Sequence, residues 1–91
     1  MDVKLPGLFD IYLNDYLEMY NYKREKPKEE KRYFKQTDDP AWQADVVYQL
    51  YTQNEAEAEY ILCWSNRIVY INYEEIPTSE QIAITVEKLS K

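Results

Sequence analysis

The residue types that most often perform catalysis are scarce in this 91-residue chain. Histidine, the commonest general base and the commonest transition-metal ligand, is absent, and the chain has one cysteine and one glycine. A zinc site would therefore need an all-carboxylate ligand set, and a glycine-rich phosphate loop cannot form around Gly7 alone. We expect a protein that is not an enzyme, with no metal site and no cofactor.

The single cysteine, Cys63, lies in the segment YILCWSNRIVYINY, residues 60–73. A nucleophilic thiol needs a nearby positive charge or a helix N-terminus to stabilise its thiolate. Arg67 is the one local cation, and the apolar neighbours of the cysteine disfavour the charged form. We interpret Cys63 as a buried structural residue and the segment as a β-hairpin with Ser65-Asn66 at its turn.

Acidic residues form three candidate carboxylate groups, at Asp38-Asp39, at Glu55/Glu57/Glu59 and at Glu74-Glu75. General acid–base catalysis by paired carboxylates needs a cleft that moves their pKa values apart. All three groups fall at predicted loops or strand ends, where carboxylates are solvated. The spacing and central glycine of an EF-hand are also missing, so we expect no catalysis at these groups and keep divalent-cation binding as a minor alternative.

An amphipathic helix is predicted over residues 8–21, LFDIYLNDYLEMYN. The large apolar and aromatic side chains fall within half a circle at 100° per residue, and Ile11 is the misfit. Tyr12, Tyr16 and Tyr20 recur at four-residue spacing on one side. Because tyrosine combines a large apolar area with a polar tip, this stripe is either a partner-binding surface or the edge of the core.

The charge distribution divides the chain into a basic segment and an acidic body. Residues 23–35 hold seven basic and three acidic residues, whereas residues 36–91 hold three basic and ten acidic ones, a balance of −7. We interpret residues 23–31 as a charged linker. The acidic body argues against direct nucleic-acid binding, which requires a positive face.

Strand and turn patterns fill the middle of the chain. Residues 32–37 are predicted as a short strand, and residues 41–52 fit either a helix or a strand; we favour a turn of helix near Trp42 and then a strand from about Asp45 to Thr52. Residues 53–59 are polar and predict a connection, followed by the hairpin strands 60–64 and 67–73.

A C-terminal helix is predicted from about Ser79 to Ser90. Thr78 and Gln81 have the spacing of a capping box, and the acidic and basic residues lie at the ends that the helix dipole favours. The whole pattern predicts an α+β fold, with a small antiparallel sheet of three or four strands and an N-terminal and a C-terminal helix packed on it. Both faces of the strand 67–73 are apolar, so either helices cover both or one face meets another protein.

These observations predict one small domain, residues 1–91, either complete or part of a longer parent protein. Its expected function is non-catalytic: an accessory or regulatory module that binds a protein partner or self-associates, with no small-molecule ligand identified. The alternatives are an acidic inhibitor that mimics DNA and occupies a basic partner, and a sensor of a small ligand or cation. The chain has no apolar stretch of 18 residues, so we expect no membrane insertion of this segment. A cytoplasmic location is the default expectation, and the alternative is an extracytoplasmic domain of a membrane-anchored parent. The residues expected to bind the partner are Tyr12, Tyr16, Tyr20 and Trp42.

Overall fold

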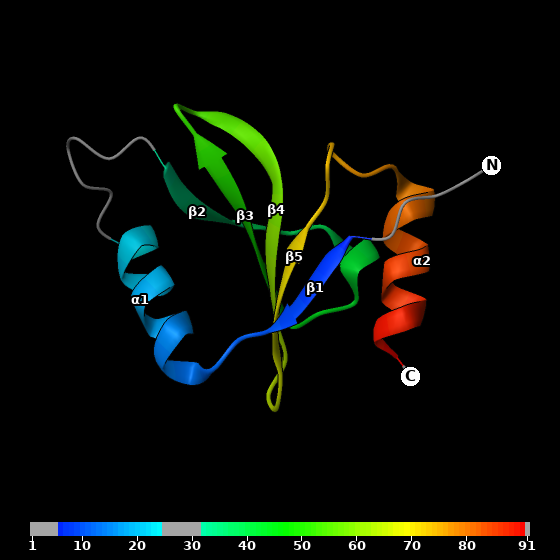
Figure 1. Ribbon diagram of the computed structural model, residues 1–91, viewed down its shortest axis with the longest axis horizontal. Helices are drawn as coiled ribbons and strands as arrows, with labels where there is room; N and C mark the ends of the chain where they lie inside the picture. Colours follow the sequence, from blue (N-terminus) through cyan, green and yellow to red (C-terminus); the bar gives the residue numbers. More distant parts are fainter. Residues whose placement is uncertain (1–5, 25–31, 91) are drawn as a thin grey trace.

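The computed structural model describes residues 6–24 and 32–90, which form an antiparallel sheet with a helix on each side (Figure 1). The elements follow the chain in the order β1 (Gly7–Asp10), α1 (Leu13–Arg24), β2 (Arg32–Thr37), the 3-10 turn η1 (Pro40–Trp42), β3 (Val46–Thr52), β4 (Glu55–Cys63), β5 (Ile68–Asn72) and α2 (Ser79–Leu89). Within these described ranges, neither helix has the combination of length and apolar composition that crossing a bilayer requires.

The sheet has five strands in the order β1-β5-β4-β3-β2, and every neighbouring pair is antiparallel. The α+β class predicted from the sequence is confirmed, but the sheet is larger than the three or four strands expected. The extra strand is β1. It pairs at one edge of the sheet with β5, which is far from β1 in the sequence. Helix α1 then connects this edge to β2 at the opposite edge (Figure 1).

The predicted helix over residues 8–21 is wrong in its first part. Residues 7–10 form β1, and α1 begins only at Leu13 and extends to Arg24, into the predicted linker. Pairing of Leu8 with Ile71 in β5 places its side chain against the core, which a local helical pattern cannot reveal. Ile11, the misfit of the helical pattern, lies in the connection between the two elements. The remaining linker, residues 25–31, lies outside the described residues.

The polar connection predicted over residues 53–59 is also wrong, because β4 already begins at Glu55. Two residues, Gln53 and Asn54, make the whole turn from β3, and both have positive φ, 53° and 71°. Two positive φ angles match the right-handed twist of the hairpin strands. Pairing of Glu55 with Thr52 then extends the ladder through a polar stretch whose composition suggested a loop.

Several other predictions are confirmed. Strand β2 covers residues 32–37, η1 contains Trp42, and β3 follows it to Thr52. The chain turns between β4 and β5 at Ser65-Asn66, with Trp64 N–H donating to the Arg67 carbonyl at 2.8 Å. The capping box of α2 has both of its hydrogen bonds.

The main core lies between the sheet and α2. Alternate residues of the central strands face α2 and η1, and the buried cluster consists of Trp42, Val47, Tyr60, Leu62, Val69, Ile71, Tyr73, Ile82 and Val86. These side chains supply most of the apolar burial that holds the domain together.

The opposite face of the sheet has a second, smaller buried group. Tyr48, Leu50 and Ile61 alternate with residues of the main core and are themselves buried. Tyr16 of α1 contacts this group, with its ring centroid 6.4 Å from that of Tyr48. Helix α1 therefore shields part of this second apolar face of the sheet from solvent.

Candidate interaction surface

Four large apolar side chains are exposed where β1 meets α1. The exposed fractions are 61% for Phe9, 82% for Tyr12, 63% for Leu13 and 47% for Leu17. We call these four residues the apolar patch. The only other exposed large hydrophobic residue in the described part of the chain is Ile76, in the connection between β5 and α2. Exposed apolar side chains of this size that follow one another closely along the chain are typical of interaction sites.

Local structure explains why these side chains point outward. Leu13 and Leu17 are four residues apart on α1 and therefore lie on one helix face. The carbonyl of Tyr12 accepts the N–H of Tyr16 at 3.0 Å, so Tyr12 sits at the start of the helix. Phe9 projects from the sheet face opposite to that of Leu8, beside Tyr70 at a ring distance of 6.4 Å.

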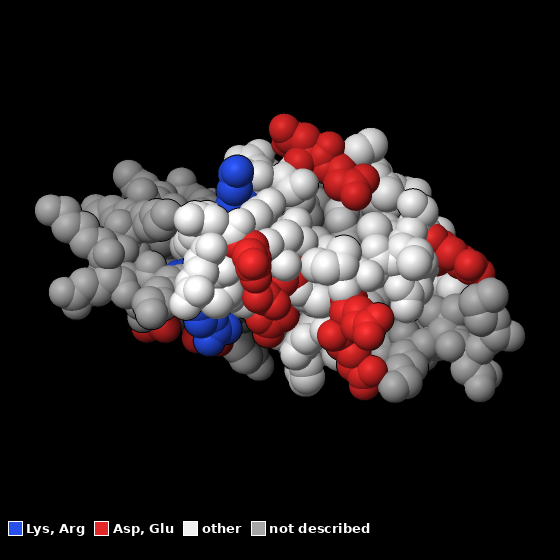
Figure 2. Space-filling view, turned by 90° about the horizontal axis from the view of Figure 1, so that it is seen from above, with Lys and Arg blue, Asp and Glu red and all other residues white. Residues whose placement is uncertain are grey.

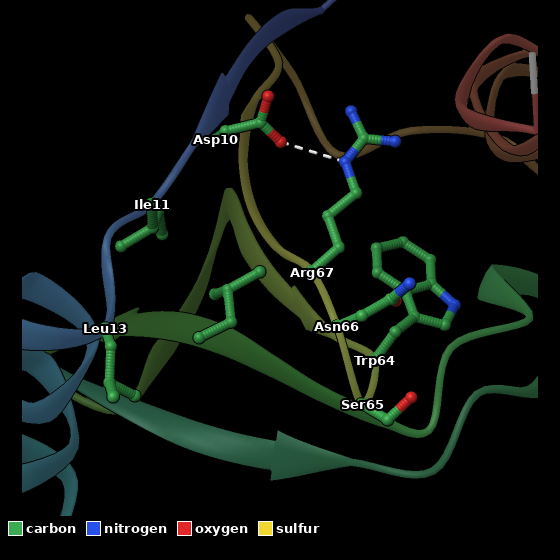
Figure 3. A pocket seen from close by; sticks show the side chains of 8 residues that line it. Asp10, Ile11, Leu13, Trp64, Ser65, Asn66 and Arg67 are labelled. Atoms are coloured by element: carbon green, nitrogen blue, oxygen red, sulfur yellow. Dashed lines mark hydrogen bonds and ion pairs between the residues drawn. The ribbon is translucent and has the colours of Figure 1, made fainter.

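A hollow of about 400 Å³ adjoins the apolar patch (Figure 3). Figure 3 shows Ile11 of the β1–α1 connection and Leu13 at the start of α1 on one side of it, and the turn between β4 and β5 on the other. Its lining residues are Asp10, Ile11, Leu13, Trp64, Ser65, Asn66, Arg67 and Ile68. Because Leu13 belongs to both, the patch and the hollow form one continuous surface.

Arg67 fixes the end of the hollow near β1. Its Nε donates to Asp10 Oδ1 at 2.8 Å, the interaction drawn in Figure 3, and its Nη1 donates to the Leu89 carbonyl at 3.3 Å. One side chain thus connects the β4–β5 turn, β1 and the C-terminal end of α2. Trp64 is held at the same turn, where its Nε1 donates to the Gln43 carbonyl at 3.1 Å.

The predicted tyrosine stripe is divided between surface and core. Tyr12 is exposed, whereas Tyr16 is half-buried against Tyr48, and its burial, with the neighbouring Tyr48 and Cys63, raises the pKa of its hydroxyl. Tyr16 therefore anchors α1 to the sheet. The side chain of Tyr20 lies outside the described side chains.

Trp42 does not belong to this surface, which corrects its assignment as a partner-binding anchor. It is 1% exposed, and its ring lies 4.7 Å from that of Tyr60 and 6.2 Å from that of Tyr73. Asp39 caps the turn η1 by accepting the Ala41 N–H at 3.0 Å and so directs the indole inward. A tryptophan beside a loop can either be buried in the core or be exposed to a partner, and the sequence around Trp42 did not indicate which.

Two members of the predicted carboxylate groups, Asp39 and Glu59, make structural contacts. Glu59 accepts a hydrogen bond from Tyr70 and lies 3.8 Å from Arg32, across the sheet face that carries Phe9. Burial and the contact with Glu59 raise the pKa of Tyr70. Among the described residues, no three cysteine, aspartate or glutamate side chains come together in a way that could hold a metal ion.

Acidic side chains are dispersed on the face of the molecule that Figure 2 shows. In Figure 2, they lie in separate groups divided by uncharged surface, rather than in one continuous acidic face. A mimic of DNA needs a continuous negative surface to occupy a basic partner. This arrangement does not favour the inhibitor hypothesis.

The sequence pattern did not identify Phe9, Leu13 and Leu17 as surface residues, because it placed them on a helix face turned toward the core. The one sign in the sequence was Ile11, an apolar residue on the polar side of the predicted helix, which lies between β1 and α1 in the structure. Comparison of the chain with protein-family models, with curated proteins and with solved structures found no match.

Proposed function

We propose that this chain is a non-catalytic module that binds a protein partner through the apolar patch and the adjoining hollow. The observation that carries the proposal is the exposure of Phe9, Tyr12, Leu13 and Leu17 at one junction of the fold. Burying a large apolar side chain contributes about 1.5–3 kcal/mol, so four such residues supply a substantial driving force for association.

The composition of the surface agrees with this role. Aromatic residues are enriched at protein interfaces, and Phe9 and Tyr12 contribute two aromatic rings here. The hollow is continuous with the patch through Leu13 and gives the partner a recess for an anchoring side chain. We therefore assign the hollow to the protein interface rather than to an independent small-ligand or cation sensor.

Charge substitution in the patch tests the proposal. The double variant Leu13→Asp/Leu17→Asp places two charges on the surface, and Ile76→Asp is the matched control, since Ile76 is 53% exposed but lies outside the patch. Proteins captured from an extract of the source cells by the wild-type chain are identified by mass spectrometry, and light scattering monitors self-association.

We expect the wild type and the Ile76→Asp variant to bind the same partner or to form the same oligomer. The double variant should lose that binding or self-association. All three proteins should keep the same circular dichroism spectrum. An equal set of captured proteins for all three, or a monomer that captures nothing, would contradict the proposal.

A further inference from the structure

We propose that the partner binds as an extended strand along the free edge of β1, with a basic residue beside Asp10 and a large apolar residue beside Phe9. This inference rests on the proposed function and specifies the chemistry of the partner. It combines three observations: the direction of the backbone groups of β1, the position of Phe9, and the charges around the apolar patch.

The outer edge of β1 presents backbone hydrogen-bonding groups. Among the described residues, β1 has a neighbouring strand on one side only, β5. Ile11 N–H donates to the Ile68 carbonyl at 2.9 Å, so the alternation of an antiparallel ladder points the backbone of Phe9 and Gly7 toward β5 as well. The N–H and C=O groups of Leu8 and Asp10 consequently point away from the sheet.

The same alternation determines which side chains an added strand would meet. The added strand is taken to run antiparallel to β1, as every neighbouring pair of this sheet does, and opposite Phe9 it would form a non-hydrogen-bonded pair, in which side chains approach most closely. Phe9 is 61% exposed and lies on the sheet face that carries Tyr70. A large apolar side chain at this position would cover the Phe9 ring and extend toward the patch residue Tyr12.

The charges around the patch favour a basic partner. Asp10 precedes the patch residue Tyr12 by two positions and keeps a side-chain exposure of 71% despite its bond to Arg67, and Asp15 and Glu18 of α1 are also exposed. The chain as a whole carries a net charge of −6. Opposite charges directly across two strands stabilise the pairing, so a lysine or arginine fits the position beside Asp10.

The other edge of the sheet is protected in a way that β1 is not. Strand β2 carries the exposed basic residues Arg32 and Lys35, which would repel the basic residue expected on the partner strand. Strand β1 has the sequence GLFD, without a basic residue. The contrast selects β1 as the edge that accepts a strand.

A defined probe tests this inference. The immobilised full-length chain is used to select from a phage-displayed library of random 12-residue peptides, and selected peptides are synthesised for fluorescence anisotropy. We expect the selected peptides to contain a lysine or arginine adjacent to a large apolar residue, and their affinity to fall as salt concentration rises.

Two variants of one residue separate backbone pairing from charge. Asp10→Ala removes the carboxylate but keeps the outward N–H, whereas Asp10→Pro removes both, and proline is tolerated on an edge strand where its nitrogen faces outward. We expect Asp10→Pro to bind the peptide at least tenfold more weakly than Asp10→Ala. Peptides N-methylated at the paired positions should lose binding, and peptides methylated one residue further along should retain it, which tests the pairing even if Asp10→Pro fails to fold.

The outcomes distinguish this inference from the proposed function. Strand addition would be overturned by peptides that bind Asp10→Ala and Asp10→Pro equally and that bind equally well whichever of the two positions is N-methylated. If the same peptides failed to bind Leu13→Asp/Leu17→Asp, the proposed interaction surface would still stand. Selection of neutral or acidic peptides, or of none, would also overturn the inference. Peptides that bind all variants equally would contradict both proposals.

Discussion

Tyr60 is the tyrosine around which the main core is organised. Its ring lies 4.7 Å from that of Trp42 and 6.3 Å from that of Tyr73, and its hydroxyl accepts a hydrogen bond from Gln49 Nε2 at 3.1 Å. Gln49 Nε2 also donates to the Glu57 carbonyl at 2.9 Å. Burial raises the pKa of Tyr60 to about 12, because the phenolate would lose its hydration.

This shift predicts a loss of stability in alkaline solution. Between pH 10 and pH 12 the unfolded chain releases the Tyr60 proton and the folded chain retains it, so the free energy of unfolding falls across this range. At about 1.4 kcal/mol per pKa unit, Tyr60 contributes on the order of 3 kcal/mol to the loss. Urea unfolding at several pH values should show a correspondingly shallower decline for Tyr60→Phe.

The exposed Tyr12 provides the control for this measurement. Tyr12→Phe should follow the wild-type stability profile, since its side chain is 82% exposed. A decline in Tyr60→Phe as steep as in the wild type would mean that other groups dominate the alkaline transition.

At the scale of elements, the turn between β3 and β4 shows how a short signal determines register. Gln53 has φ 53°, a left-handed conformation that is costly for most residues and easier for asparagine. Asn54, at φ 71°, is already suited to its position, and its Oδ1 accepts a hydrogen bond from the Tyr33 hydroxyl at 3.1 Å. Gln53 is therefore the strained member of the pair.

Substitution at Gln53 should change stability in opposite directions. Gln53→Asn should raise the free energy of unfolding by about 0.5–1 kcal/mol, and the β-branched Gln53→Val should lower it by about 1 kcal/mol. Chemical denaturation monitored by tryptophan fluorescence measures both. Equal stability of the two variants would show that the turn relaxes to another conformation without cost.

The elements that were predictable are those specified by local chemistry. The α2 cap at Thr78 and the turn at Ser65-Asn66 follow from neighbouring residues, and both are present. Strand β1 and the first half of β4 were missed because they depend on pairing with distant or polar partners. The same error concealed the interaction surface. Because residues 7–10 form a strand, Phe9 lies on a face of the sheet rather than on a helix.

At the scale of the whole molecule, the described side chains of the two helices differ in burial. Helix α2 buries Ile82, Thr85 and Val86 in the main core. In α1, the described side chains cover residues 13–18, and of these only Tyr16 is not exposed. The apolar patch therefore includes residues of α1, the helix whose described side chains are less buried.

This asymmetry predicts different rates of hydrogen exchange. Local opening requires less free energy where few apolar contacts are lost, so the backbone amides of α1 should exchange before those of α2, a helix of nearly equal length. Tyr16→Ala should accelerate exchange in α1 and leave α2 unchanged, because Tyr16 contacts the opposite face of the sheet. Mass spectrometry of exchanged peptides resolves the two helices. Equal protection of α1 and α2 would mean that residues beyond Tyr16 anchor α1, and the patch would then lie on a rigid surface that a partner meets without ordering the helix.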